Sequence, residues 1–167
     1  MPTLAVVHIS DGETDKCLDA VELIASACFE IVRGADESLL TITGDVAFSG
    51  AESEYSTFRQ RLLEPLLSRL STECGRPVRV AIAPGNHDCI LKPQNEVRET
   101  LIEAIVSTPS KADNEAMVLA CVEVQKHFFS FAETHFSPPA EMPSKLFWQQ
   151  RFEVEGKKVL VSTLNAA

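Results

Sequence analysis

Three short apolar segments, at residues 4–9, 39–43 and 78–83, restrict the fold of this chain more than any other feature. Each is rich in aliphatic residues and too short for a buried helix, so each is predicted to form a buried strand. Between them, apolar residues recur every three or four positions over residues 14–34 and 53–70, which predicts amphipathic helices. Strands that alternate with helices in this way indicate an α/β domain whose early strands are parallel.

The remainder of the chain predicts more helices and a final hairpin. Pro65 is expected to kink or break the helix at 53–70, because proline has no N–H to donate to the helix. Further helices are expected near residues 97–106 and 114–134, and strands at 151–154 and 158–164 flank a turn at 155–157. We expect a single domain over residues 1–167, in which residues 89–142 are a candidate helical insertion that shapes access to a site.

The last residues of the chain bear on whether the domain is complete. The apolar strand at 158–164 is followed only by Asn165-Ala166-Ala167. A sheet that stopped there would have unpaired edges and bare apolar surface. We therefore expect a truncated domain with further C-terminal sequence.

Composition excludes several classes of protein. A net charge of −9 and a pI near 4.9 argue against a broad nucleic-acid-binding surface, which needs clustered Lys and Arg. The longest apolar run, 116–122, is too short to cross a membrane, and the N-terminus has no secretory signal. Five scattered cysteines without a CxxC pair indicate reduced thiols and a cytoplasmic protein.

Each of the first three predicted strands ends in residues that can bind a cation. Asp11 and Asp45 offer carboxylate oxygens, Asn86 a carbonyl oxygen and His87 an imidazole. Carboxyl ends of parallel strands are where functional groups gather, and such ligands suit Mg²⁺, Mn²⁺, Fe or Zn²⁺. Taken singly, Gly44-Asp45 reads as an ordinary turn. Three such strand ends in order favour a metal site.

These strand ends resemble the first three signature blocks of the calcineurin-like metallophosphoesterases: Asp11, then Gly44-Asp45, then Gly85-Asn86-His87-Asp88. The resemblance covers residues 4–90 and continues more loosely to Leu164-Asn165. It implies an α/β fold of the four-layer sandwich type, incomplete at the C-terminus. It also implies a hydrolase of phosphate mono- or diesters with two divalent metal ions (Mn, Fe or Zn).

The resemblance also implies a role for each matching residue. Asp11 would bind the first metal, Asp45 would bridge both metals and Asn86 would bind the second. His87 would lie near the substrate and protonate the leaving oxygen or stabilise the transition state, and Asp88 would hold its ring. A metal-bound hydroxide would attack phosphorus, and the cations would stabilise the developing charge.

The chain departs from the family pattern in two places. Glu13 stands where the family has a metal-binding histidine, so it is either a substitute carboxylate ligand or a solvated residue at a helix entry. The later blocks, a lone histidine and Gly-His-x-His, are absent. His8 is interpreted as structural, and His127 and His135 as histidines of the core edge or the surface. This chain is therefore expected to carry the N-terminal half of the site and to be poorly active alone.

The sequence supports two functions. The first is a metal-dependent phosphoesterase whose substrate the sequence does not specify. The second is a non-catalytic binding or regulatory module that keeps the phosphoesterase fold, which Glu13 favours and Gly85-Asn86-His87-Asp88 disfavours. A nucleotide-binding domain is disfavoured, because no Gly-x-Gly-x-x-Gly or Gly-x4-Gly-Lys-Ser/Thr follows a predicted strand. An aromatic-rich zone is assigned to the core or an insertion: Phe128, Phe129, Phe131, Phe136, Phe147 and Trp148.

Overall fold

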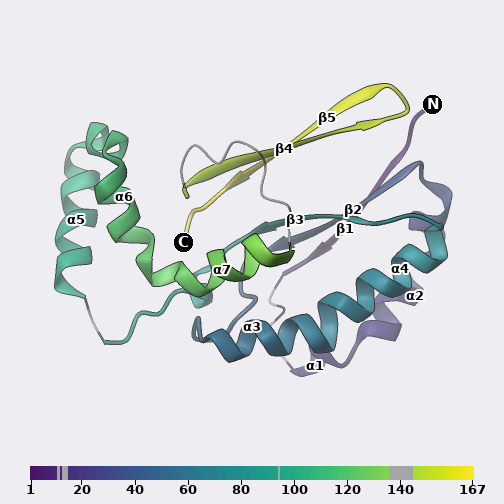
Figure 1. Ribbon diagram of the computed structural model, residues 1–167, viewed down its shortest axis with the longest axis horizontal. Helices are drawn as coiled ribbons and strands as arrows, with labels where there is room; N and C mark the ends of the chain where they lie inside the picture. The colour runs from purple at the N-terminus through teal and green to yellow at the C-terminus, as the bar shows by residue number, and fades with distance from the viewer. Residues whose placement is uncertain (11, 13–14, 94, 136–144) are drawn as a thin grey trace.

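The computed structural model describes residues 1–10, 12, 15–93, 95–135 and 145–167. Its centre is a parallel sheet in the order β1-β2-β3, made by β1 (Leu4–Ile9), β2 (Glu37–Thr43) and β3 (Arg79–Ala83). A second, antiparallel pair consists of β4 (Phe147–Val154) and β5 (Lys157–Leu164). The mixed α/β class and the parallel early strands are confirmed (Figure 1).

The register of the parallel sheet brings the three strand ends together. Ile9 pairs with Ile42, and Ile42 pairs with Ile82 on the next strand. Because the strands run in one direction with no offset at their ends, the loops that follow them leave from the same edge. Of the candidate ligands, this edge carries the two that lie within the described residues, Asp45 and Asn86.

One face of the sheet is covered by helices from the N-terminal half of the chain (Figure 1). These are α1 (Asp15–Leu18), α2 (Val21–Gly34), α3 (Glu52–Phe58) and α4 (Glu64–Cys74). The core between the two layers is aliphatic and includes Val32, Leu40, Ile42, Leu66 and Leu70. The expected helix at 14–34 is interrupted at residues 19–20, so the prediction of one continuous helix is wrong there.

The helix around Pro65 absorbs the proline without a break. A π-helical turn, η1 (Arg59–Leu63), joins α3 to α4, so the chain stays helical from Glu52 to Cys74. Within η1 the Glu64 N–H donates to the carbonyl of Arg59, five residues back. This wider turn brings the chain to Pro65 at the start of α4, where a missing N–H costs little.

Helices of the second half lie to the side of the sheet. In Figure 1, α5 (Glu96–Ser107) and α6 (Glu115–Val122) stand away from the sheet on the side of its carboxyl ends, and α7 (Lys126–His135) runs back beside it. Asn95 and Asn114 cap the first two of these helices by accepting from Arg98 N and Met117 N. The expected helix at 114–134 is divided by a 3₁₀ turn, η4 (Glu123–Gln125).

Aromatic side chains fasten α7 to its neighbours. Phe131 lies 5.4 Å from Tyr55 and 6.2 Å from Phe58, ring centre to ring centre, and Phe129 lies 6.2 Å from Trp148. The predicted assignment of this zone to the core is confirmed for Phe128, Phe129, Phe131 and Trp148. Phe147 is half-buried at the start of β4. Phe136 lies outside the described residues.

The β4–β5 hairpin lies across the other face of the sheet, opposite α2–α4 (Figure 1). Its two-residue turn, Glu155 and Gly156, has positive φ angles of 46° and 76°, as the predicted hairpin turn requires. Strand β4 begins earlier than expected, at Phe147, because all eight residues of β5 find a partner on it. Arg79 on β3 lies 4.6 Å above the Phe152 ring on β4 and ties the two layers together.

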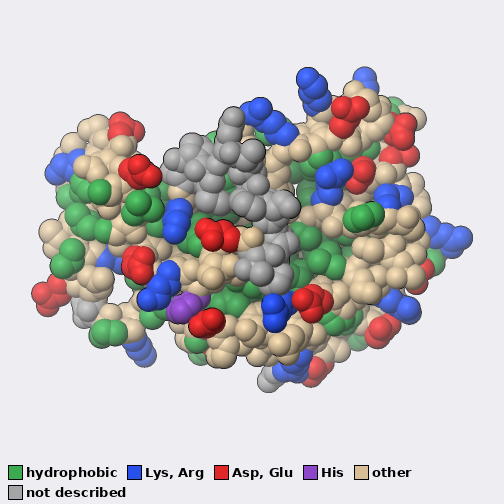
Figure 2. Space-filling view, viewed as in Figure 1, with side chains coloured by type: hydrophobic (Ala, Val, Ile, Leu, Met, Phe, Trp, Pro, Cys, Tyr) green, Lys and Arg blue, Asp and Glu red, His purple; other side chains and the backbone are tan. Residues whose placement is uncertain are grey.

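The surface agrees with the composition. On the face shown in Figure 2, Lys and Arg side chains are scattered among Asp and Glu and form no continuous basic patch in the part of the chain that is described. Among the described residues, no helix combines the length and apolar content needed to cross a membrane.

The packing of α4 against the sheet leads to a stability prediction. Leu66→Ala removes a side chain that is 0 % exposed and should lower the free energy of unfolding by about 2–5 kcal/mol, because a cavity remains. Leu23→Ala, at a side chain that is 75 % exposed, should change it by less than about 0.5 kcal/mol. Urea unfolding followed by circular dichroism measures both; equal losses would contradict this arrangement of the core.

Candidate metal and phosphate site

The loop after β2 places Asp45 in an unusual backbone conformation. Gly44 has a φ of 87° and Asp45 a φ of 52°, both in the left-handed region. Aspartate enters this region more readily than most residues, yet it is seldom chosen without a reason. Gly44 N still donates to the carbonyl of Ala83 at 2.9 Å, so the turn begins while the strand is paired with β3.

The loop after β3 approaches Asp45 so closely that only glycine fits. A Cβ added to Gly85 would lie 2.2 Å from Asp45 Oδ1 and 2.5 Å from Asp45 N. Across this contact, His87 N donates to Asp45 Oδ1 at 3.1 Å. The carboxylate of Asp45 is therefore held against the main chain of the third block, and the second and third blocks form one unit.

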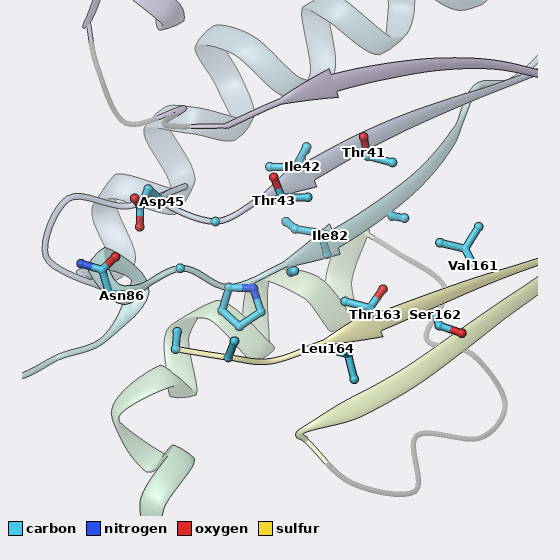
Figure 3. A pocket seen from close by; sticks show the side chains of 17 residues that line it. Thr41, Ile42, Thr43, Asp45, Ile82, Asn86, Val161, Ser162, Thr163 and Leu164 are labelled. Carbon is cyan, nitrogen blue, oxygen red and sulfur yellow. The ribbon is translucent and has the colours of Figure 1, made fainter.

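Asp45 and Asn86 lie at one end of a cavity between the parallel sheet and β5 (Figure 3). The cavity has a volume of about 620 Å³. Its sheet wall includes Thr41, Thr43 and Ala83, and its opposite wall includes Thr163 and Leu164 of β5. Two polar side chains at the mouth of a mainly apolar cleft are a common arrangement for a ligand site.

The His87 ring is oriented by the loop after β2. Its Nδ1 lies 2.9 Å from the carbonyl oxygen of Phe48, and the two rings are 5.4 Å apart. Because a carbonyl oxygen can only accept, Nδ1 carries the hydrogen of this bond, and Nε2 is then the ring atom that can exchange a proton. The side chain of His87 is half-exposed, which suits a group that meets substrate.

Asp88 points away from this surface and into the protein, where it is 1 % exposed. Its carboxylate accepts from Gly85 N, Val46 N, Ala47 N and the Tyr55 hydroxyl. Burial raises the pKa of Asp88, and these four hydrogen bonds oppose the rise. The family resemblance implies that Asp88 holds the His87 ring. In this structure, the carbonyl oxygen of Phe48 accepts the hydrogen bond from His87 Nδ1. The Asp88 carboxylate accepts its hydrogen bonds from the loops after β2 and β3 and from α3.

The acidic residues of the first block, Asp11 and Glu13, lie outside the described residues. The predicted metal-ligand role of Asp11 and the two interpretations of Glu13 therefore stay predictions. His8 is on β1, where Nε2 lies 2.5 Å from Thr43 Oγ1, as expected for a structural histidine. His127 is half-buried on α7, and His135 is the last residue of that helix.

A pair of amide side chains, the buried Gln125 and the half-buried Asn165, holds the end of β5 at the cavity. Asn165 Nδ2 donates to Gln125 Oε1 at 2.7 Å, and Gln125 Nε2 donates to Asn165 Oδ1 at 3.2 Å. Asn165 also bonds to the carbonyls of Lys145 and Leu146, which keeps Ala166 in the cavity wall. No role was predicted for this pair from the sequence, although a polar residue directly after a buried strand is the same signal that singled out Asp45.

The donor atoms fit part of a site for divalent cations. Asp45 and Asn86 supply carboxylate and amide oxygens from neighbouring strand ends, and hard cations prefer such oxygens. Within the described ranges, no three His, Cys, Asp or Glu residues gather closely enough to hold a metal ion by themselves. Asp45 and Asn86 alone could therefore supply only part of the ligand set of a metal ion.

Comparisons of this chain with protein-family models, curated proteins and solved structures found no match. Its function is therefore inferred from the residues of the site.

The contact between the two loops can be tested at its glycine. Gly85→Ala should lower the free energy of unfolding by about 1–3 kcal/mol, because the new methyl group would overlap Asp45 and force the loops apart. Gly34→Ala is the matched control: a Cβ there meets nothing within 4 Å, and stability should change by less than about 1 kcal/mol. Thermal unfolding of both variants gives the comparison, and a neutral Gly85→Ala would show that the loops are not in contact.

Proposed function

We propose that this chain forms part of a metal-dependent phosphoesterase of the calcineurin-like type and contributes the N-terminal half of a dinuclear metal site. The main support for the proposal is the close contact between Gly44-Asp45 after β2 and Gly85-Asn86-His87-Asp88 after β3. Asp45 Oδ1 accepts from His87 N across the contact with Gly85, so a candidate metal ligand at one end of the cavity is held against the loop that carries the candidate acid. The His87 side chain does not itself line the cavity, and its ring lies against Phe48. The proposed fold is the four-layer α/β sandwich of that family, and the mixed α/β arrangement of the described residues is compatible with it.

The proposed chemistry assigns a task to each described residue. Asp45 and Asn86 would hold the metal ions, and Asp11 is proposed as a further ligand. When bound, two divalent cations would stabilise the charge that develops on the phosphoryl oxygens. His87, with Nδ1–H bonded to the Phe48 carbonyl, would act in its imidazolium form and give the Nε2 proton to the leaving oxygen of a phosphate mono- or diester, which leaves a neutral ring.

A cytoplasmic location is part of the same proposal. All five cysteines have free thiols, as expected in a reducing compartment. Burial raises the pKa of Cys28 and Cys89, so these thiols are poor candidates for reactive nucleophiles.

A non-catalytic binding or regulatory module is the second candidate. Glu13 in the place of the usual histidine favours it, because a carboxylate differs from imidazole in reach and charge. Such a module would keep the joint between the loops and the cavity but would not turn over a phosphate ester. Metal binding without hydrolysis would distinguish it from the enzyme.

Metal binding gives the first test. Titration calorimetry with Mn²⁺ should show binding to the wild-type chain, and Asp45→Asn should weaken it at least about 10-fold, because the substitution removes the anionic ligand. Asp113→Asn, at an exposed residue of the 3₁₀ turn before α6, is the matched control and should leave the affinity unchanged. A wild-type chain that binds no Mn²⁺ would refute the proposed site.

Hydrolysis gives the second test. With Mn²⁺ and bis-p-nitrophenyl phosphate, the protein as the cell produces it should release p-nitrophenol, and His87→Ala should lower kcat by about 100-fold or more while Mn²⁺ affinity is kept. His127→Ala, at a half-buried residue of α7 and not in the loops after β2 and β3, should have no effect. Equal rates for the two histidine variants would remove His87 from the chemistry, and no turnover despite bound Mn²⁺ would favour the binding module.

A further inference from the structure

The carboxylate of Asp88 accepts four hydrogen bonds next to the site, although it does not line the cavity. Gly85 N donates to Oδ2 at 2.8 Å and Ala47 N donates to Oδ1 at 3.0 Å, with Val46 N at 3.4 Å from Oδ2. These donors come from the loop after β3 and from the loop after β2. One buried carboxylate therefore cross-links both loops that carry the candidate ligands.

Tyr55 supplies the fourth donor from a different layer of the fold. Its hydroxyl donates to Asp88 Oδ1 at 3.0 Å, and its side chain is 3 % exposed. Burial and the neighbouring Asp88 carboxylate raise the pKa of the phenol, so it stays protonated and acts as a donor. The ring packs against Phe131 of α7 at 5.4 Å, which fixes it from the other side.

The bonds of Asp88 bracket the candidate ligands along the chain. Asp45 directly precedes Val46 and Ala47, which donate to the carboxylate. Asn86 lies between Gly85, another donor, and Asp88 itself. A displacement of either loop would therefore break a bond to a buried charge, which is costly in a protein interior. The left-handed conformation of Asp45 also needs such support from its surroundings.

We infer that Tyr55 and Asp88 are positioning residues, which hold the Asp45 and Asn86 side chains at the spacing that divalent cations require. This inference rests on the proposed function. Both side chains are buried and neither lines the cavity, so each acts through the ligands and not on the substrate. Partners that orient metal ligands in this way typically account for a 10- to 100-fold change in metal affinity or activity.

The test must separate positioning from ordinary stabilisation. Tyr55→Phe keeps the buried ring and removes only the hydroxyl, and Asp88→Asn keeps the side-chain shape and removes the charge. Val32→Ala is the matched control, because it deletes core volume at a side chain that is 0 % exposed on α2 and lowers stability without touching either loop. Circular dichroism first establishes that all three variants fold.

Titration calorimetry with Mn²⁺ is the decisive measurement. Tyr55→Phe should weaken binding about 10-fold, Asp88→Asn should weaken it by at least as much, and Val32→Ala should leave it unchanged. The double variant should lose less than the product of the two single losses, because both substitutions weaken the hydrogen bonds of the same carboxylate. In the hydrolysis assay, KM for bis-p-nitrophenyl phosphate at saturating Mn²⁺ should stay constant in Tyr55→Phe.

The other outcomes have distinct meanings. If Tyr55→Phe binds Mn²⁺ as tightly as the wild type, the positioning role is refuted while the proposed metal site stands. If Val32→Ala weakens binding as much as Tyr55→Phe does, the effect is one of general stability and the positioning role is again refuted. If the wild-type chain binds no Mn²⁺, the proposed function and the inference that rests on it are both refuted.

Discussion

The contact between the loops after β2 and β3 is the constraint on which the site depends. Gly85 lies so close to Asp45 that no side chain fits at that position, and the hydrogen bond from His87 N crosses the same contact. Two loops held at this distance act as one body. The buried Asp88 carboxylate completes the joint, because it accepts from both loops and from α3. The close packing of Gly85 on Asp45 and the hydrogen bonds of Asp88 thus both fix the relative position of the two loops.

The rest of the fold brings the two loops to this joint. The parallel register of β2 and β3 ends with Thr43 opposite Ala83, so both loops leave the sheet at the same level. The helices packed on one face keep the sheet rigid, and the long helix from Glu52 to Cys74 delivers Tyr55 beneath the loops. On the opposite face, the amide pair of Gln125 and Asn165 holds the end of β5 in place as the far wall of the cavity.

Local patterns in the sequence predicted the local structure well. The apolar segments became β1–β3, Gly34 ends α2, and the turn at Glu155 and Gly156 has the expected conformation. Helix continuity was harder to predict, because a π turn before Pro65 or a 3₁₀ turn at Glu123–Gln125 leaves the apolar spacing almost unchanged. These local patterns could not predict which side chains bond to each other within the site. Tyr55 and Asp88 are 33 residues apart, and apolar periodicity describes only neighbours along a strand or helix.

The same limit explains why Gly85-Asn86-His87-Asp88 read as a single functional unit, whereas the structure turns Asn86 toward the cavity and Asp88 into the core. This division of one motif bears on the choice between an enzyme and a binding module. The cross-link made by Asp88 would serve either, since both need an ordered fold. The conformation of Asp45 is different: apolar packing alone does not require a left-handed aspartate at a place where a side chain on Gly85 would overlap it. Such a conformation at one end of the cavity, beside the Asn86 side chain, fits the proposal that the carboxylate binds a cation. Under the proposed function, the geometry of Asp45 suits metal binding, and the orientation of the His87 ring suits proton transfer.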